Sequence, residues 1–160
     1  MGVVYDLFYR ILTVYQIPPT TSGSPSDTMT HQQKIEILNA GLDDKQGHFL
    51  IDIKKDSKHF AIESATQGIK IPKMTLDEIT PDEKNLVLKL DCELCEYNVI
   101  LNSTEECLKK FDRILIEFHD GNRNLINELT SIGFKVLILN SRFTFKKKYR
   151  GHLLAVNRNL

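Results

Sequence analysis

The second half of the chain alternates short apolar runs with helical segments, and this alternation constrains the fold more than any other feature. The apolar runs are Leu86 to Leu90, Ile114 to Phe118 and Lys135 to Leu139. The helical segments are Glu96 to Leu101, Thr104 to Phe111 and Asn122 to Ile132. Strands that alternate with helices are typical of parallel sheets. We predict an α/β fold with a mostly parallel sheet, to which His152 to Val156 adds an antiparallel edge strand.

The first half has a weaker pattern. Val3 to Ile17 carries apolar residues at helical spacing and predicts an amphipathic helix, although its many β-branched and aromatic residues would also suit a strand. Two prolines and a Ser- and Thr-rich stretch follow, which we interpret as a linker. Residues 1–31 are therefore predicted as an N-terminal helix or strand plus linker, and residues 32–160 as the α/β domain.

Between the linker and the regular half, the pattern predicts short elements. Ile35 to Leu38 and Phe49 to Ile53 are predicted as the two strands of a hairpin, because Asp43 to Gly47 has turn chemistry. Ile69 to Ile71 is predicted as a further strand. Thr75 is predicted to cap a short helix, with Glu78 as its capping-box partner.

Composition excludes several classes of protein. With 160 residues, 41% of them hydrophobic, the chain is long enough for one compact domain. The 21 basic and 21 acidic side chains balance, so no overall field attracts nucleic acid or a membrane. No apolar run is long enough to span a bilayer and no signal segment is recognisable, so we expect a cytoplasmic protein. Three cysteines are an odd number in such a chain, and we expect them to be reduced.

Chemistry-bearing residues follow two of the predicted strands. Asp91 and Glu93 come directly after Leu86 to Leu90, where open α/β sheets bind ligands, and a partly buried carboxylate there can accept a proton. Alternatively, Glu93 and Glu96 are the solvated start of a helix. His119 follows the next strand and suits a general base or a ligand; alternatively it is a loop or capping residue.

Two further features have a structural alternative. Cys92 and Cys95 form a C-x-x-C pair, which suits a redox motif or half of a zinc site. Acidic neighbours would raise the thiol pKa, which is unfavourable for a redox motif, and the second ligand pair of a zinc site is absent. We therefore favour structural packing and predict no metal site. Ser141 to Leu160 carries six basic and no acidic residues, with aromatic residues between them. This stretch suits weak nucleic-acid contact or, alternatively, a solvated basic loop. No glycine-rich phosphate-binding motif occurs anywhere in the chain.

The run from Val87 to Tyr97, VLKLDCELCEY, resembles the LKxDCEGCEY signature of the FkbM family of S-adenosylmethionine-dependent methyltransferases, particularly its archaeal members. Further matching pieces follow the order of the family and extend the resemblance over about Ile35 to Val156. These pieces are Leu38 to Leu42 with Gly47, Ile71 to Glu78, Ile116 to Gly121 and Gly133 to Val136.

The resemblance implies a truncated, Rossmann-like class I methyltransferase fold. It also implies S-adenosylmethionine as cofactor and a small-molecule or sugar hydroxyl as methyl acceptor. On this reading Asp91 and Glu93 lie beside the transferring methyl group, and His119 is a base on the acceptor. Asn39 and Ala40 are the implied cofactor-binding residues.

Two departures from the family limit what the resemblance implies. The family's glycine-rich D-x-G-A-x-x-G turn and its two flanking strands are missing, and Leu94 stands where the signature has glycine. In the family's strand order, 3-2-1-4-5-7-6, the missing strands lie between those at Ile35 and Leu86. The alternative function is therefore a non-catalytic binding or assembly module of the same fold.

The missing strands would leave the apolar strand at Leu86 with an open edge, which the chain must cover. Three arrangements would cover this edge. The Ile35 strand could pair directly with the Leu86 strand, the N-terminal segment could fill the gap, or two chains could join edge to edge. We expect direct pairing or a homodimer.

Overall fold

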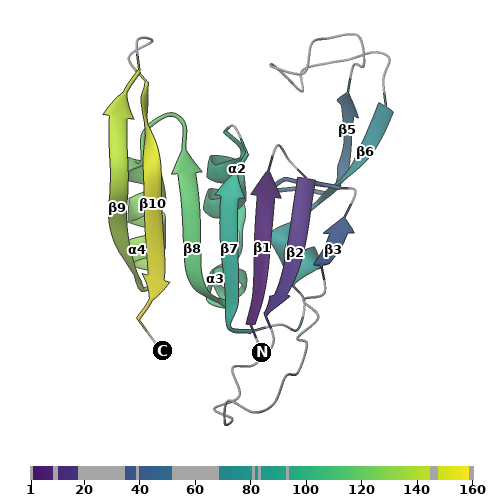
Figure 1. Cartoon of the computed structure of the whole chain (residues 1–160), viewed down its shortest axis with the longest axis horizontal. Coiled ribbons are helices and arrows are strands. Elements are labelled where there is room, and N and C mark those ends of the chain that lie inside the picture. Colours follow the sequence, from purple (N-terminus) through teal and green to yellow (C-terminus); the bar gives the residue numbers. More distant parts are fainter. Residues whose placement is uncertain are drawn as a thin grey trace, which may run out of the picture.

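The computed structural model describes residues 2–8, 11–17, 35–38, 40–51, 69–80, 82, 84–92, 94–144 and 148–158. Within these residues, seven strands form a larger sheet in the order β3-β2-β1-β7-β8-β10-β9 (Figure 1). They are β1 (Gly2–Phe8), β2 (Ile11–Ile17), β3 (Ile35–Leu38), β7 (Leu86–Asp91), β8 (Phe111–Phe118), β9 (Phe134–Phe143) and β10 (Tyr149–Asn157). A smaller sheet has the order β4-β6-β5, with β4 (Gly41–Leu42), β6 (Ile69–Met74) and β5 (Gly47–Ile51).

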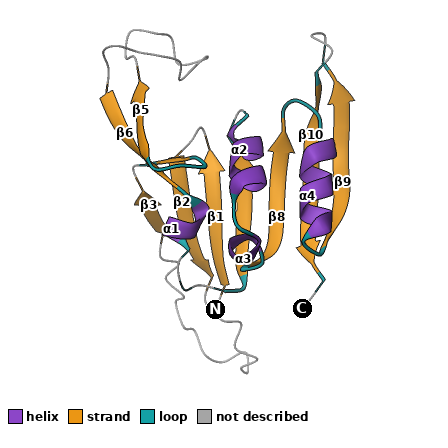
Figure 2. Cartoon of the chain, turned by 180° about the vertical axis from the view of Figure 1, so that it is seen from behind, coloured by secondary structure: helices purple, strands orange, loops and turns teal. Residues whose placement is uncertain are grey.

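The helices are short and lie against one face of the larger sheet. They are α1 (Leu76–Ile79), α2 (Cys95–Asn102), α3 (Glu105–Leu108) and α4 (Arg123–Ser131). Figure 2 shows α2, α3 and α4 in front of β7, β8 and β10. The core lies in this layer, where Leu88 and Ile116 of the strands belong to one buried cluster with Ile100 and Leu129 of the helices.

Strand β7 shows how the local sequence produces two faces. Its buried residues, Leu86, Leu88 and Leu90, alternate with half-buried ones, because successive side chains of a strand point to opposite faces. The buried set packs on the helical layer, and Asp91 therefore belongs to the face opposite the described helices.

The α/β prediction is confirmed, but the prediction of a mostly parallel sheet is wrong. Among the pairs of the larger sheet, β1 with β7 and β7 with β8 are parallel. The other four pairs are antiparallel. His152 to Val156 is antiparallel as expected, yet it does not form an edge, because β10 lies between β8 and β9. The sequence pattern predicts a strand but does not predict which strands pair with it.

The N-terminal segment forms a pair of antiparallel strands, so the strand alternative is confirmed and the helix is wrong. β1 and β2 pair from Gly2↔Ile17 to Phe8↔Ile11, and β1 also pairs with β7 from Val3↔Leu86 to Phe8↔Asp91. This strand therefore fills the gap beside β7, whereas we expected direct pairing with the Ile35 strand or a second chain. Burial of the apolar edge of β7 overrides the helical spacing in this segment.

Other local predictions have mixed outcomes. The predicted hairpin of Ile35 to Leu38 with Phe49 to Ile53 is wrong, because β3 pairs with β2 while β5 pairs with β6. The capping box of Thr75 and Glu78 is confirmed in both directions at the start of α1. The predicted helix from Thr104 to Phe111 is shorter than expected, since α3 ends at Leu108 and Phe111 begins β8.

Candidate functional site

Three side chains with ligand or acid–base chemistry meet at the carboxyl ends of β7 and β8. Asp91 is the last residue of β7, Glu117 lies one residue before the end of β8, and His119 follows that strand. The parallel register pairs Leu90 with Ile116, so Asp91 and Glu117 are neighbours one residue further along. Their carboxylates and the His119 ring each offer a ligand atom, and these atoms lie within 4.8 Å of one another.

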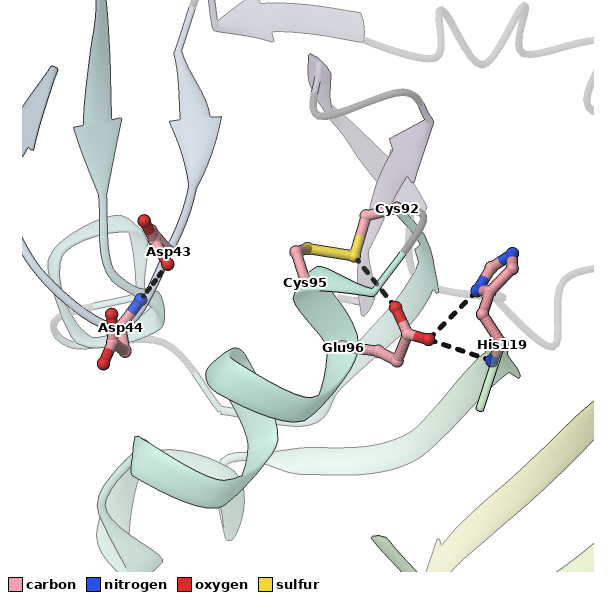
Figure 3. The surroundings of a disulfide bond; sticks show 6 residues. All are labelled: Asp43, Asp44, Cys92, Cys95, Glu96 and His119. Atoms are coloured by element: carbon pink, nitrogen blue, oxygen red, sulfur yellow. Dashed lines mark hydrogen bonds and ion pairs between the residues drawn. A yellow bond between two sulfur atoms is a disulfide. The ribbon is translucent and has the colours of Figure 1, made fainter. Parts of the chain in front are cut away.

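A buried carboxylate holds the ring of His119. Oε1 of Glu96, the second residue of α2, accepts a hydrogen bond from the His119 backbone N–H at 3.1 Å and lies 3.0 Å from Nδ1 (Figure 3). Both residues are buried, with exposed fractions of 0% for Glu96 and 1% for His119. An ionised carboxylate can only accept a hydrogen bond, so in the neutral ring Nδ1 is the protonated nitrogen and Nε2 carries the lone pair. The dyad therefore fixes both the orientation and the tautomer of the ring.

Glu117 lies between two histidine rings on the face of the sheet opposite the described helices. Its Oε1 is 3.9 Å from Nε2 of His119, and its Oε2 is 3.5 Å from Nε2 of His152. His152 is the partner of Glu117 in the β8–β10 register, and its Nδ1 lies 3.0 Å from Oδ1 of Asn140. Each ring therefore has an oxygen at Nδ1 and directs Nε2 to the same carboxylate.

The chain between Asp91 and Glu96 is closed by a disulfide. Cys92 is bonded to Cys95, the first residue of α2, across a Cα–Cα distance of 5.5 Å. The expectation that all three cysteines are reduced is therefore wrong, and only Cys107 is free. Figure 3 also marks a contact of 3.7 Å between Cys92 Sγ and Oε2 of Glu96. A disulfide sulfur has no proton to donate, so this is a van der Waals or polar contact.

Leu94 lies inside this disulfide loop in the left-handed region, with φ +82°. Glycine adopts this conformation without cost, whereas a side chain there costs about 1–2 kcal/mol. The glycine of the resembled signature therefore corresponds to a backbone requirement. The Leu94 side chain is 45% exposed, so it projects away from the core and does not fill the site.

Tyr97 positions the loop that follows His119. Its hydroxyl accepts a hydrogen bond from the backbone N–H of Asp120 at 2.7 Å and donates one to the carbonyl of Gly121 at 2.7 Å. Burial raises the pKa of Tyr97, so the hydroxyl keeps the proton that it donates. Through Glu96 and Tyr97, one face of α2 orders the end of β8.

The predicted site residues do not all meet. Asp91 and His119 come together, while Glu93 and Asn39 lie outside the described residues. Ala40 is buried directly after β3. Because β2 and β1 separate β3 from β7, it lies three strand spacings, or about 14 Å, from Asp91 along the same edge of the sheet.

Sequence reasoning missed several members of this cluster. It did not assign a role to Glu117 or His152, whose side chains meet only through the β8–β10 register. The alternative in which Glu96 lies on a solvated helix start is wrong, because Glu96 is buried. Its hydrogen-bond partner lies 23 residues away along the chain, so no local spacing marks the pair.

The basic C-terminal stretch has internal partners where it is described. The ring of Tyr149 packs on Phe143 and Phe118, with centroid distances of 4.9 and 5.5 Å. Lys148 forms an ion pair with Asp120 at 3.3 Å. Lys146 and Lys147 lie outside the described residues. Nucleic-acid contact thus stays a prediction.

The chain matches no family model, and it is similar to no curated protein or solved structure at a level that shows a relationship. Among the described helices, none has the length and apolar character needed to cross a bilayer. The geometry of Asp91, Glu117 and His119 is therefore the main indication of function.

Proposed function

We propose that the chain is an FkbM-type methyltransferase module that keeps the acceptor side of the site, lacks the cofactor side and acts by binding or assembly. The order β7-β8-β10-β9, with β10 antiparallel, supports this proposal. It corresponds to strands 4-5-7-6 of the class I order. The cluster of Asp91, Glu117 and His119 lies at the carboxyl ends of the first two of these strands, where such folds bind their ligands.

The observation that carries the proposal is the β1–β2 hairpin. In the resembled family, the strand beside strand 4 leads through a glycine turn to a helix N-terminus that receives the cofactor. Here the strand beside β7 is β1, and Phe8 already pairs with Ile11 of the antiparallel strand β2. The chain thus returns along the sheet at the point where the family enters a helix. These residues do not fit S-adenosylmethionine.

Calorimetric titration of the purified chain with S-adenosylhomocysteine tests this proposal. We expect no heat of binding up to millimolar ligand, because neither a glycine turn nor a helix N-terminus follows β1. Saturable binding at micromolar ligand would contradict the binding-module proposal and would favour an active enzyme. A second titration after chemical crosslinking of the chain tests whether a neighbouring copy completes the site.

A homodimer through the edge strand β9 is the form of assembly that we propose. β9 is at the end of the sheet and exposes Leu137, Ile138, Leu139 and Phe143, with exposed fractions from 42% to 76%. A long apolar edge strand is a template for pairing with another chain. Sedimentation equilibrium should give twice the chain mass, and Ile138→Lys should give the monomer mass. A wild-type monomer would contradict the dimer.

Methyl transfer to a hydroxyl is the second candidate, and the Glu96–His119 dyad favours it. A general base must present a lone pair at a fixed position, and the hydrogen bond at Nδ1 gives Nε2 of His119 this property. In this candidate His119 accepts the proton of the acceptor hydroxyl, Glu96 stabilises the resulting imidazolium, and Asp91 contacts the acceptor. S-adenosylmethionine would supply the electrophilic methyl group, and a neighbouring chain would have to supply the cofactor-binding wall that β1 and β2 do not form.

Activity measurements on variants test this second candidate. Asp91→Ala and His119→Gln should each abolish methyl transfer to a panel of hydroxyl acceptors while the circular dichroism spectrum is retained. His48→Gln is a matched control, because His48 is exposed on β5 in the smaller sheet. Absence of transfer by the wild-type chain would leave the binding module as the function.

A further inference from the structure

We infer that Asp91, Glu117 and His119 form a binding site for a divalent first-row transition-metal ion. The inference does not depend on the proposed function, because it concerns only side chains at the ends of β7 and β8. Their three ligand atoms, from two neighbouring parallel strands, lie within 4.8 Å of one another. A buried imidazole and two carboxylates are the donor types that Mn²⁺, Fe²⁺, Co²⁺ and Zn²⁺ share.

The distances are close to those of a bound ion. Ligand atoms about 2.1 Å from a tetrahedral metal ion are about 3.4 Å from one another. Oε1 of Glu117 and Nε2 of His119 are 3.9 Å apart, so binding requires these atoms to approach by about half an ångström. Rotation of the Glu117 side chain can supply this shift, since this side chain is 31% exposed. The ligand atom of Asp91 lies within 4.8 Å of the other two and must approach the ion as well.

The surroundings of His119 have the form that metal ligands need. A metal-bound histidine usually donates its second ring N–H to a carboxylate, which orients the ring and increases its basicity. Glu96 takes this role at Nδ1 and also binds the His119 backbone N–H. The ring is thus held by a buried carboxylate on one side and directs Nε2 at Glu117 on the other. A histidine in a merely structural role does not require two further carboxylates there.

His152 supports the same carboxylate from the next strand. Its Nε2 lies 3.5 Å from Oε2 of Glu117, the oxygen that does not face His119. This contact leaves Oε1 for the ion. Because an ion on Nε2 of His119 uses the lone pair of the ring, metal binding and the general-base role exclude each other.

The disulfide removes two thiolates as possible ligands near this site. Cys92 and Cys95 are bonded to each other, and the third cysteine, Cys107, is buried beside Thr80. In the oxidised protein a transition metal therefore meets nitrogen and oxygen donors at this rim. The spectrum of bound Co²⁺ distinguishes this donor set from one that includes thiolate.

The test is titration of the full, oxidised chain with Co²⁺, followed by displacement with Zn²⁺. We expect one Co²⁺ per chain, visible d–d bands without a thiolate charge-transfer band, and displacement by Zn²⁺, as the order of affinities requires. Mg²⁺ at the same concentration should not compete. No saturable signal, or a thiolate band, would overturn the site.

Variants then identify the ligands. Asp91→Asn and Glu117→Gln should each weaken Co²⁺ binding by more than about tenfold, and Glu96→Gln by about 10–100-fold because it acts through His119. His48→Gln should bind as the wild type does. Equal affinity in all variants would overturn the assignment. For a variant that does not fold, NMR of the wild type decides: Mn²⁺ should broaden signals of residues 91, 117 and 119 before those of His48, and the reverse order would contradict the site.

Discussion

Glu96→Ala gives the sharpest test of how the candidate site is held together. Glu96 is fully buried, and its carboxylate accepts from both the backbone N–H and Nδ1 of His119. Alanine removes both acceptors and leaves two donors of His119 inside the protein. Two hydrogen bonds to a charged group contribute about 1.5–3 kcal/mol each, so their loss should cost about 3–6 kcal/mol.

Urea denaturation followed by circular dichroism measures this loss. With a slope of about 2 kcal/mol per molar urea, a loss of about 4 kcal/mol lowers the midpoint by about 2 M. Glu96→Gln keeps the shape and one acceptor oxygen, so its loss should be intermediate. Glu106→Ala is the control, because Glu106 is exposed on α3, and its stability should change by less than about 0.5 kcal/mol.

A loss below about 1 kcal/mol for Glu96→Ala, equal to that of the control, would refute this reasoning. It would mean that the carboxylate does not form the hydrogen bonds on which the orientation of His119 depends. The general-base and metal-ligand roles of His119 would then both lack their support.

Three further predictions concern other parts of the chain. Burial raises the pKa of Cys107 to about 11, so the native protein should react slowly with a thiol reagent at pH 8, and urea should release one thiol per chain before reduction and three after; rapid native reaction would contradict this. Burial acts to raise the pKa of Asp43, but its hydrogen bonds to Lys73 and to the Asp44 backbone outweigh burial and lower it. The stabilisation by this pair should therefore be present above the usual carboxyl pKa and be lost as the pH falls through the lowered value, so the difference in unfolding free energy between wild type and Lys73→Met should shrink on acidification; a constant difference would contradict the pairing. Gly151→Ala should destabilise by about 1–3 kcal/mol or more, because its Cβ would lie 2.2 Å from the Asn140 carbonyl oxygen; an unchanged melting temperature would show that β9 yields without cost.

Much of the second half of the fold follows from local sequence. The apolar runs at Leu86 to Leu90 and Ile114 to Phe118 lie within β7 and β8 as predicted, because alternation or continuity of apolar residues reflects burial of the strand itself. The capping box at Thr75 was also predictable from local sequence, because its partner Glu78 lies only three residues away. Asp91 and His119 were predictable as candidates because one ends β7 and the other follows the neighbouring strand β8.

The partners of these elements were less predictable. The N-terminal segment carries residues that suit both a helix and a strand, and pairing with β7, more than 80 positions further along the chain, decides between them. The Cys92–Cys95 disulfide was not predicted, because the acidic neighbours and the odd number of cysteines favoured free thiols.

By itself the sequence determined the α/β class and the position of Asp91 and His119 after two strands. Both follow from local patterns, because strand burial and turn formation depend on residues only a few positions apart. Only the tertiary structure decided that β1 covers β7, that Glu96 is buried against His119, and that Glu117 lies between two histidines. Val3 and Leu86 are more than 80 positions apart, Glu96 and His119 are 23 apart, and Glu117 and His152 are 35 apart. The formation of these contacts depends on the free energy of the whole sheet, which no local pattern records.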